Sequence, residues 1–463
     1  MSIVSRLKNL LSRTSGIAIV LVGFSWSGSG QTPPDLANGV SGNQFTRFFK
    51  PHSDWSAECN PSLLHAYKSI GVKSIRVPVS NEILYQDANP SVLNPQNLLA
   101  LDTIVIRKLL DSGFTVILDA GHPLSGAGGP ASFMQMLAQD SLGARNKFRA
   151  YWLALVRYFQ RYPTDKLVYE LINEPYSNDP KNHQFMYALQ DSLVQDIRRI
   201  DTVHWIAVAG RRNDKMMDGL VDSLPGIPYR DERKSITFPP IPAKKLIYTF
   251  HWYQPDVLIF QGLKSANLWG CTGHLPYPAY TGCADSLIAS GCGNYGSVVQ
   301  WQIYETARPY QVQALPLWGR HRMDSLIRQA ANYGQEHQVP IWMGEGMCFA
   351  RPNGIDRDSR IRYMTDLVGI LRSDHIGFSL WDPSGAAVQL VKGRMDQPSF
   401  DTLLLTKMGF FTQSPVSAAT PHKGKPSLSE KKTGTRQTEN RALDSPVSAQ
   451  ATGRKRSPAP ENP

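Results

Sequence analysis

The sequence predicts an α/β fold, a (β/α)₈ TIM barrel, over residues 31–411. Short runs of β-branched and other apolar residues alternate along this part of the chain with longer patterns of helical period. Each run is almost continuously apolar, which is typical of parallel strands covered on both faces. No G-x-G-x-x-G motif follows a strand, which disfavours a dinucleotide-binding doubly wound sheet. Eight strand–helix turns therefore favour a closed barrel.

The expected elements follow one another regularly. The strands are predicted at 39–45, 73–79, 114–119, 166–172, 204–209, 245–251, 339–344 and 377–381. The helices are predicted at 62–70, 98–110, 147–161, 185–200, 323–337, 361–371 and 400–407. This body exceeds a minimal barrel by roughly 130 residues. Most of the surplus falls in two insertions, about 211–243 and 256–318, which follow strands and are therefore expected as long loop insertions on the catalytic face.

The two ends of the chain differ from its body. The 463 residues carry a formal net charge of +11, with 41% apolar and 19% charged residues, which excludes a wholly disordered chain and a multi-span membrane protein. Residues 1–30 have three basic residues before an apolar run, as in an export signal or signal anchor. Residues 412–463 predict a disordered basic Ser/Pro-rich tail. The body is nearly neutral, so its charge indicates no nucleic-acid partner.

The five cysteines fit an exported chain with one or two disulfides and at least one remaining thiol. Cys271, Cys283 and Cys292 lie close together in the second insertion, and the pairing stays open. A zinc site would require C-x₂-C or H-x₃-H spacing, which the sequence lacks. A metal-dependent barrel hydrolase would need H-x-H near the first strand, where residues 39–52 contain only His52. We therefore expect neither a metal nor a cofactor.

Polar side chains collect where the predicted strands end. In chain order these are Arg76, Asp119 with His122, Asn173 and Glu174, His251 with Tyr253, Glu345, and Trp381. In a barrel they converge on one mouth, where active sites of this fold are built. Each residue has an ordinary structural explanation by itself, such as an interior ion pair for Arg76 or a helix cap for Asn173. Their joint occurrence favours a catalytic site, because buried charge without a purpose is costly.

Two of these residues, Glu174 and Glu345, are carboxylates facing each other across the mouth. Such a pair suggests general acid/base and nucleophilic work on a glycosidic bond. One carboxyl must hold a proton for the leaving oxygen, while the other must stay ionised. Arg76 and the Tyr253 hydroxyl are candidates to keep one of them ionised. Tryptophans near the mouth would offer flat apolar faces to sugar rings: Trp252, Trp269, Trp301, Trp318, Trp342 and Trp381.

Together these segments resemble glycoside hydrolase family 5, the cellulase-type retaining glycosidases. The segments that carry the resemblance are Ile75-Arg-Val-Pro-Val79, Val116-Ile-Leu-Asp119, Leu171-Ile-Asn-Glu-Pro175, His251-Trp-Tyr-Gln-Pro255, Gly344-Glu-Gly346 and Leu380-Trp-Asp382. The most specific is Asn-Glu-Pro after a strand. The resemblance covers about residues 39–411.

The resemblance implies a role for each site residue. Glu174 matches the general acid/base and Glu345 the nucleophile of the family. Asn173 matches the residue that binds the sugar 2-hydroxyl, Arg76 and Tyr253 the residues that orient the nucleophile. His251 matches a histidine near the reacting ring, and Trp381 the platform under the sugar beside the scissile bond. A retaining pair stands about 5–5.5 Å apart.

Three features depart from the family pattern. The third strand ends Asp119-Ala-Gly-His122, with the histidine one residue later than usual, so either His122 fills the role after a small shift or the contact is lost. Gly346-Met347-Cys348 stands where an aromatic residue usually follows the glutamate. The insertion at 256–318 is long and contains cysteines.

The leading hypothesis is an exported, secreted or periplasmic, retaining β-glycosidase acting on a β-linked polysaccharide, β-glucan first and mannan second. The expected partner is this polysaccharide or oligosaccharide substrate, with membrane contact only through an uncleaved N-terminal anchor, and the expected state is a monomer. The alternative is a catalytically silent polysaccharide-binding barrel, suggested by the departures above.

Overall fold

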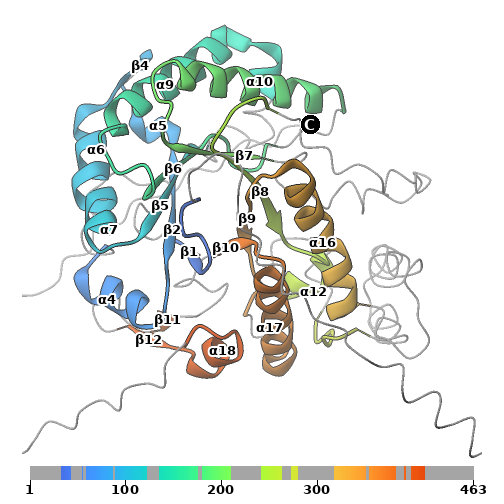
Figure 1. Ribbon diagram of the computed structural model, residues 1–463. Coiled ribbons are helices and arrows are strands. Elements are labelled where there is room, and N and C mark those ends of the chain that lie inside the picture. Colours follow the sequence, from blue (N-terminus) through green and yellow to red (C-terminus); the bar gives the residue numbers. More distant parts are fainter. Residues whose placement is uncertain are drawn as a thin grey trace, which may run out of the picture. The chain divides into compact units, whose positions relative to one another are not determined.

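Eight parallel strands form a closed barrel at the centre of the computed structural model (Figure 1). They are β1 (Gly39–Ser41), β2 (Ser74–Ser80), β5 (Thr115–His122), β6 (Leu167–Glu170), β7 (Trp205–Ala209), β8 (Leu246–Trp252), β9 (Ile341–Gly346) and β10 (Gly377–Leu380). Neighbours in this order pair with each other, and β1 closes the barrel by pairing with β2 and β10. Every predicted strand overlaps one of these, so the predicted TIM barrel is confirmed.

The structure describes residues 33–42, 55, 59–86, 89–122, 135–175, 180–209, 241–262, 273–279, 318–350, 354–381, 391–392 and 398–411. The chain divides into two units, Met1–Ser414 and Pro415–Pro463, and all described residues belong to the first. The predicted export segment 1–30 and tail 412–463 lie outside the described residues. So do most of the two insertions, of which 241–243, 256–262, 273–279 and 318 are described.

Helices follow the strands around the barrel. The longer ones are α4 (Pro61–Ser69), α9 (Ala144–Phe159), α10 (Pro180–Arg198), α16 (Arg320–His337) and α17 (Arg357–Ser373). The shorter ones are α5 (Asn81–Leu84), α6 (Pro95–Ala100), α7 (Arg107–Asp111), α12 (Asp256–Ile259), α18 (Thr402–Lys407) and a 3₁₀ turn, Ser141–Gly143. A π-helical segment, Leu101–Ile106, joins α6 to α7. Two small hairpins, β3 (Tyr85–Gln86) with β4 (Asn89–Leu93) and β11 (Val391–Lys392) with β12 (Ser399–Phe400), lie outside the barrel sheet.

Most helices begin earlier than their apolar pattern predicts, and at three of them a polar side chain caps the first turn. The Asn94 side chain accepts hydrogen bonds from the N–H groups of Gln96 and Asn97, and Pro95 occupies the first turn. The Asp356 side chain accepts from the Ser359 N–H at the start of α17. The apolar periodicity therefore located the helices correctly, but the predicted ranges omit the first turn of several helices.

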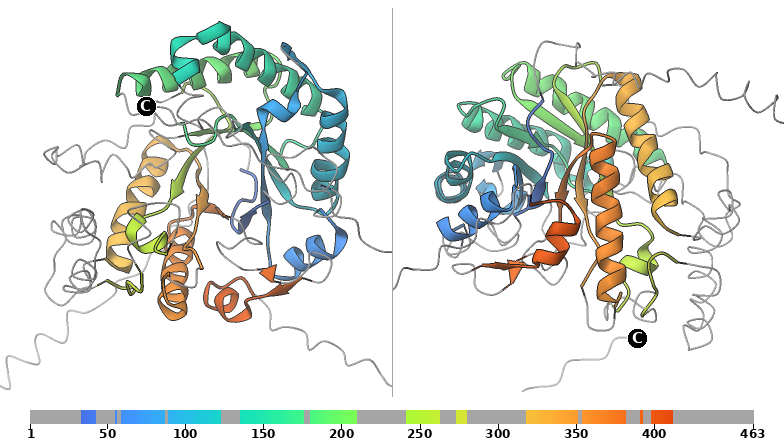
Figure 2. Two further views of the ribbon diagram at one scale, coloured as in Figure 1. Left: turned by 180° about the vertical axis from the view of Figure 1, so that it is seen from behind. Right: turned by 60° about the horizontal axis from the view of Figure 1, so that its bottom comes forward.

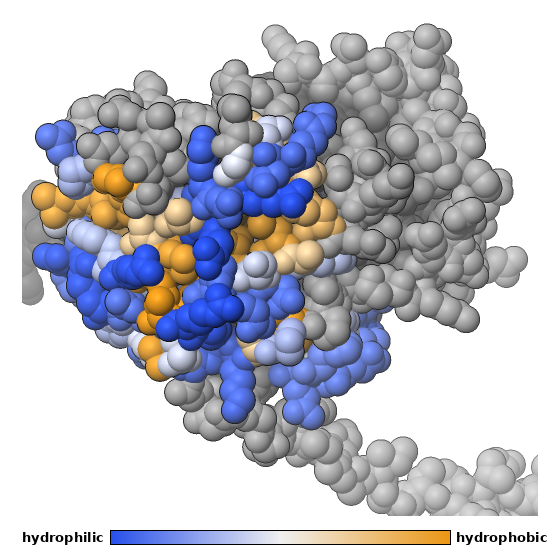
Figure 3. Space-filling model, turned by 90° about the horizontal axis from the view of Figure 1, so that it is seen from above, coloured by the Kyte–Doolittle hydropathy of each residue, from blue (hydrophilic) through white to orange (hydrophobic). Residues whose placement is uncertain are grey.

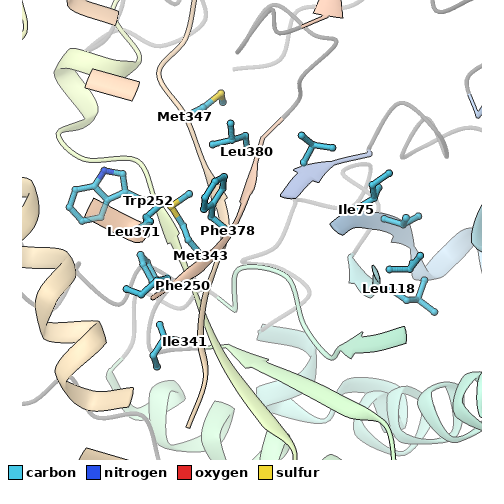
Figure 4. Packing of buried hydrophobic residues seen from close by; sticks show 14 of the residues in the cluster. Ile75, Leu118, Phe250, Trp252, Ile341, Met343, Met347, Leu371, Phe378 and Leu380 are labelled. Atoms are coloured by element: carbon cyan, nitrogen blue, oxygen red, sulfur yellow. The ribbon is translucent and has the colours of Figure 1, made fainter. Parts of the chain in front are cut away.

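Alternation along the strands separates two layers of core. Ile117, Val168, Ala207, Ile247 and Trp342 belong, with Leu36 and Trp205, to a compact cluster of buried residues from five neighbouring strands and the segment before β1. The intervening residues pack under the helices in a second, larger cluster. In Figure 4 Phe378 and Met343 lie near Leu371 of α17. The wall of the barrel is thus apolar on both sides.

The outer surface is formed by the helices. Helices α16 and α17 lie side by side (Figure 2). On the face shown in Figure 3 hydrophobic residues are interspersed with hydrophilic ones. None of the helices among the described residues is long and apolar enough to cross a membrane.

The two described cysteines, Cys59 and Cys348, are buried thiols outside any disulfide. Burial raises the pKa of each thiol to about 12, which keeps both protonated at neutral pH. The expectation of at least one remaining thiol is met by these two residues. Cys271, Cys283 and Cys292 lie outside the described residues.

A buried carboxylate, Asp201, fixes the turn between α10 and β7. Its side chain accepts hydrogen bonds from the N–H groups of Val203 and His204 and from the His204 ring nitrogen Nδ1 at 2.7 Å. Burial opposes ionisation of Asp201, but these hydrogen bonds outweigh it and lower its pKa. The ionised carboxylate is therefore part of the folded structure.

We predict that Asp201→Ala lowers the free energy of unfolding by about 1–3 kcal/mol at neutral pH, because three donors, two of them buried, lose their acceptor. Since the folded-state pKa of Asp201 is depressed, its contribution is complete above the ordinary aspartate pKa. It is lost as the pH falls through the folded-state pKa. Denaturant unfolding of wild type and variant at neutral and acidic pH measures this difference. Asp165→Asn, at an exposed turn, is the control. Equal stability of wild type and Asp201→Ala at neutral pH would contradict the prediction.

Candidate active site

Six of the predicted site residues lie together at the mouth of the barrel. Arg76 comes from β2, Asn173 and Glu174 follow β6, His251 and Tyr253 come from the end of β8, and Glu345 lies in β9. Carboxyl ends of parallel barrel strands meet at one face, which explains how residues so distant in sequence converge. The predicted convergence is thus present in the structure for these six residues.

Glu345 is buried and held from two sides. Its Oε1 accepts a hydrogen bond from Arg76 Nη1 at 2.6 Å, and its Oε2 accepts one from the Tyr253 hydroxyl at 2.6 Å. Only 6% of its side chain is exposed. Both oxygens are therefore oriented before any ligand arrives.

Glu174 lies opposite and is more accessible, with 26% of its side chain exposed. Its backbone φ is +41°, in the left-handed region that non-glycine residues adopt only at a cost. His251 Nδ1 lies 2.9 Å from Glu174 Oε1 and 3.5 Å from Glu345 Oε2. A carboxylate oxygen of Glu174 and one of Glu345 lie within 4.8 Å of each other. One shared ligand atom could therefore contact both carboxyl groups.

A β-bulge sets the direction of Glu345. In the pairing of β8 with β9, Phe250 is opposite Met343 but His251 is opposite Glu345, so Gly344 is an extra residue in β9. A Cβ atom at Gly344 would lie 2.7 Å from Thr249 Oγ1 and 3.0 Å from His251 Nε2. Only glycine fits here, and the bulge turns Glu345 toward His251.

A second bulge accounts for the displaced histidine of the third strand. Pro78 is opposite Asp119, but Ser80 is opposite His122, so β5 contains one extra residue between them. A Cβ at Gly121 would lie 2.1 Å from the Leu171 carbonyl oxygen, so this position also requires glycine. The bulge places the His122 backbone where an unbulged strand would place residue 121. The His122 side chain lies outside the described part of the structure.

Two acidic residues that were not among the predicted site residues complete the surroundings of Arg76. Glu170 accepts from Arg76 Nε at 2.7 Å and from Nη2 at 2.9 Å, and Asp119 accepts from Nη2 at 2.9 Å. Asn173 Oδ1 accepts from the same Nη2 at 2.8 Å. Asp119 had appeared only as a polar strand end, and Glu170 as part of an apolar run. A single charged residue inside an otherwise apolar strand was the signal for Glu170.

The aromatic residues divide between mouth and core. Trp381 is partly exposed. Its backbone N–H donates to the Gly346 carbonyl at 3.3 Å, which places the Trp381 backbone beside the end of β9. The prediction was wrong for three other tryptophans, because Trp252, Trp318 and Trp342 are buried in the core. Trp252 and Trp342 belong to strands whose apolar faces are covered, and their rings supply core volume. Trp269 and Trp301 lie outside the described residues.

The pKa of Glu345 is raised mainly by burial, which disfavours the charged form. The charges of His251 and Arg76 and the hydrogen bond from Tyr253 oppose this rise, while Glu174 adds to it. Burial and the nearby carboxylates likewise raise the pKa of the Tyr253 hydroxyl well above its usual range, so Tyr253 remains a donor. The site therefore combines a buried, oriented carboxyl with an accessible one.

Glu174, His251 and Glu345 are close enough to ligate one metal ion. However, both Glu345 oxygens already accept short hydrogen bonds, and the Arg76 guanidinium lies 2.6 Å from one of them. A fixed cation in this position repels a divalent ion. This donor set therefore fits a pair of reacting carboxyl groups better than a metal site.

Comparison with known proteins adds a family to this geometry. Residues 38–386 match the family model described as cellulase (glycosyl hydrolase family 5). Endoglucanase A of Paenibacillus barcinonensis is 23% identical over 230 residues, which cover 47% of this chain and 54% of that protein. The chain thus matches only about half the length of this relative.

Solved structures share the fold at low sequence identity. A structure described as an endoglucanase aligns with a TM-score of 0.57 and 16% identity, covering 81% of this chain and 97% of that one. Cellulose synthase subunit Z of Clostridioides difficile aligns with a TM-score of 0.55 and 16% identity, covering 80% and 98%. Cel5A of Thermotoga maritima, solved with mannotriose, aligns with a TM-score of 0.56 and 16% identity, covering 81% and 97%.

We predict that Tyr253→Phe raises the pKa of Glu345, because the variant lacks the hydrogen bond that favours the ionised carboxyl. Titration of the glutamate side-chain carbons by NMR measures the change. Tyr277→Phe is the matched control, since the Tyr277 hydroxyl donates to Asp366 at 2.8 Å, outside the site. An unchanged Glu345 pKa in Tyr253→Phe would show that the hydroxyl does not support the charge.

Proposed function

The chain belongs to glycosyl hydrolase family 5, the cellulase family, and on this basis we propose that it is a retaining β-glycosidase. In this proposal it hydrolyses O-glycosidic bonds of a β-linked polysaccharide by double displacement. The observation that carries the proposal is the approach of Glu174 and Glu345 oxygens to within 4.8 Å. Retaining pairs stand about 5–5.5 Å apart, whereas inverting pairs leave about 6.5–9.5 Å for a water molecule.

The two carboxyl groups take different parts in this reaction. An oxygen of Glu345 attacks the anomeric carbon while the bond to the leaving oxygen breaks, and Glu174 gives its proton to that oxygen. In the second step Glu174 takes a proton from water, the water oxygen bonds to the anomeric carbon, and Glu345 leaves as a carboxylate. The hydrogen bonds from Arg76 and Tyr253 support Glu345 as an anion before attack and after release. The accessibility of Glu174 suits proton exchange with solvent.

The proposed substrate is a cellulose-like β-glucan, with mannan second. The Paenibacillus barcinonensis relative and one of the aligned structures are described as endoglucanases, and Thermotoga maritima Cel5A was solved with mannotriose and, in a mutant form, with cellobiose. Partly exposed Trp381 beside the end of β9 offers an apolar ring to a sugar face. Incubation with a panel of β-linked polysaccharides, followed by sizing of the products, tests the substrate class.

We further propose that residues 1–30 direct export, that residues 31–411 act as a monomer, and that the polysaccharide is the main partner. The basic and apolar composition of residues 1–30 supports the first point. Cell fractionation of the full chain and of a chain without residues 1–30 tests it. Equal cytoplasmic retention of both would contradict export, and a dimer in gel filtration would contradict the monomer.

We predict that Glu174→Gln and Glu345→Gln each reduce kcat by about 10³-fold or more, because each amide can neither transfer a proton nor attack. Reducing-sugar release from the best polysaccharide measures this loss. Glu336→Gln, at an exposed position on α16, is the matched control and retains activity. Circular dichroism confirms that the variants remain folded.

The anomeric configuration of the first product, followed by NMR, provides the second measurement. Retention is expected, and inversion would contradict double displacement. Polysaccharide binding by calorimetry without any hydrolysis would instead favour the catalytically silent barrel. The displaced His122 and the Gly346-Met347-Cys348 segment are the features that keep this alternative open.

A further inference from the structure

The guanidinium of Arg76 has more hydrogen-bond acceptors around its Nη2 than that nitrogen has hydrogens to donate. Its Nη2 has two hydrogens, yet three acceptor oxygens lie within 2.9 Å of it, on Asp119, Glu170 and Asn173. The other nitrogens donate to Glu170 and Glu345. One cation is therefore surrounded by three carboxyl groups, and one acceptor at Nη2 lacks a hydrogen of its own.

This cluster is cut off from solvent. The side chains of Arg76, Asp119 and Glu170 are fully buried, and that of Glu345 is 6% exposed. If all three carboxyl groups were ionised, the cluster would hold two uncompensated negative charges. Burying such charge costs several kcal/mol per ion, and proteins avoid it by binding a proton.

The contacts distinguish the three carboxyl groups. Glu170 forms a bidentate ion pair with Nε and Nη2 of Arg76, which is a strong arrangement for an ionised carboxylate. Glu345 receives hydrogen bonds on both oxygens. Among side chains only Arg76 Nη2 donates to Asp119, the Gly121 backbone N–H adds some support for its charge, and its Oδ1 is buried without a hydrogen-bond partner among the described residues. The ionised form is therefore least supported at Asp119.

We propose that Asp119 is a neutral, protonated carboxylic acid in the resting protein, and that Glu170 is the ionised counterion that positions Arg76 for Glu345. A proton on Asp119 Oδ2 removes one negative charge and leaves two acceptors, on Glu170 and Asn173, for the two hydrogens of Nη2. The proposal extends the proposed function to two residues that do not touch the substrate. It assigns Glu170 a positioning role, because its hydrogen bonds with Nε and Nη2 leave Nη1 directed at Glu345.

The charged groups around Asp119 agree with this assignment. Burial raises the pKa of Asp119 well above its usual range. Arg76 on β2 and the Gly121 backbone N–H oppose the rise, and Glu170 on β6 and Glu345 on β9 add to it. Farther into the mouth lie Glu174, His251 and Tyr253, which contact Glu345 or each other. No other cation contacts Asp119 among the described residues.

Infrared difference spectroscopy at neutral pH tests the proton directly and needs no substrate. Glu174, the proposed acid, also carries a proton, so every protein is compared in the Glu174→Gln background. The carbonyl stretch of a protonated carboxylic acid is expected in this background and should be absent when Asp119→Asn is added. In Glu170→Gln this band should also disappear, because Asp119 then ionises and replaces the missing counterion. A spectrum unchanged in Asp119→Asn would overturn the proposal. If a variant does not fold, titration of the band in Glu174→Gln alone keeps the test open: a band that disappears as the pH is raised, before neutral pH is reached, would also overturn the proposal.

The kinetic test rests on the proposed hydrolysis and uses a chromogenic aryl β-cellobioside. Asp119→Asn resembles the neutral acid, so kcat/KM should stay within about 3-fold of the wild-type value. The acidic limb of the pH profile of kcat/KM, which reports ionisation of Glu345, should not move. Glu170→Gln should lower kcat by about 10²-fold with KM little changed, because the guanidinium is misplaced. The double variant Asp119→Asn/Glu170→Gln leaves Glu345 as the one carboxyl group that contacts Arg76 among the described residues. Because no neighbouring anion in this cluster then opposes ionisation of Glu345, the acidic limb should move to lower pH.

The outcomes separate the two ideas. A shift of the acidic limb to lower pH in Asp119→Asn alone would mean that Asp119 was ionised, and would overturn the inference. Full activity of Glu170→Gln would overturn its positioning role. Absence of hydrolysis in the wild type would contradict the proposed function but leave the infrared result intact.

Discussion

The site depends on one buried cation. The guanidinium of Arg76 binds Asp119, Glu170, Asn173 and Glu345, which come from β5, β6, the segment after β6, and β9. It thereby joins β2 to β6 and β9, two strands with which β2 does not pair in the barrel sheet. Loss of one partner from a buried ion pair costs about 3–5 kcal/mol, so folding and site geometry share the same interaction. Glu345 is oriented because the barrel itself is held together at this point.

Two β-bulges that contain glycine set the direction of side chains and backbone at the site. Gly344 turns Glu345 toward His251, and Gly121 lets β5 pass close to the Leu171 backbone. A strand without these bulges would send the next side chain to the opposite face. The left-handed backbone of Glu174 serves the same end on the other side of the mouth. Local irregularity is thus concentrated at the two strand ends that carry the carboxyl groups and at the neighbouring end of β5.

The tryptophans of the strands follow a different constraint. Trp252 donates its indole N–H to the Tyr363 hydroxyl at 2.8 Å, and Trp342 packs with Ile247 in the inner cluster. Large rings at strand ends can belong to either side of the barrel wall, and the strand's alternation decides which. A sugar-binding role therefore depends on exposure rather than on residue type alone, and Trp381 is partly exposed.

The sequence by itself determined the eight strands, the order of the helices and six residues that meet at the mouth, because apolar period and strand-end polarity are local signals. It could not reveal that Glu170 and Asp119 share Arg76, because charge pairing between side chains of different strands depends on distances that only the closed barrel creates. It also could not tell how β5 absorbs the extra residue before His122, or which tryptophans are buried. Those outcomes depend on register and on the inward or outward direction of each side chain, which the tertiary structure alone decides.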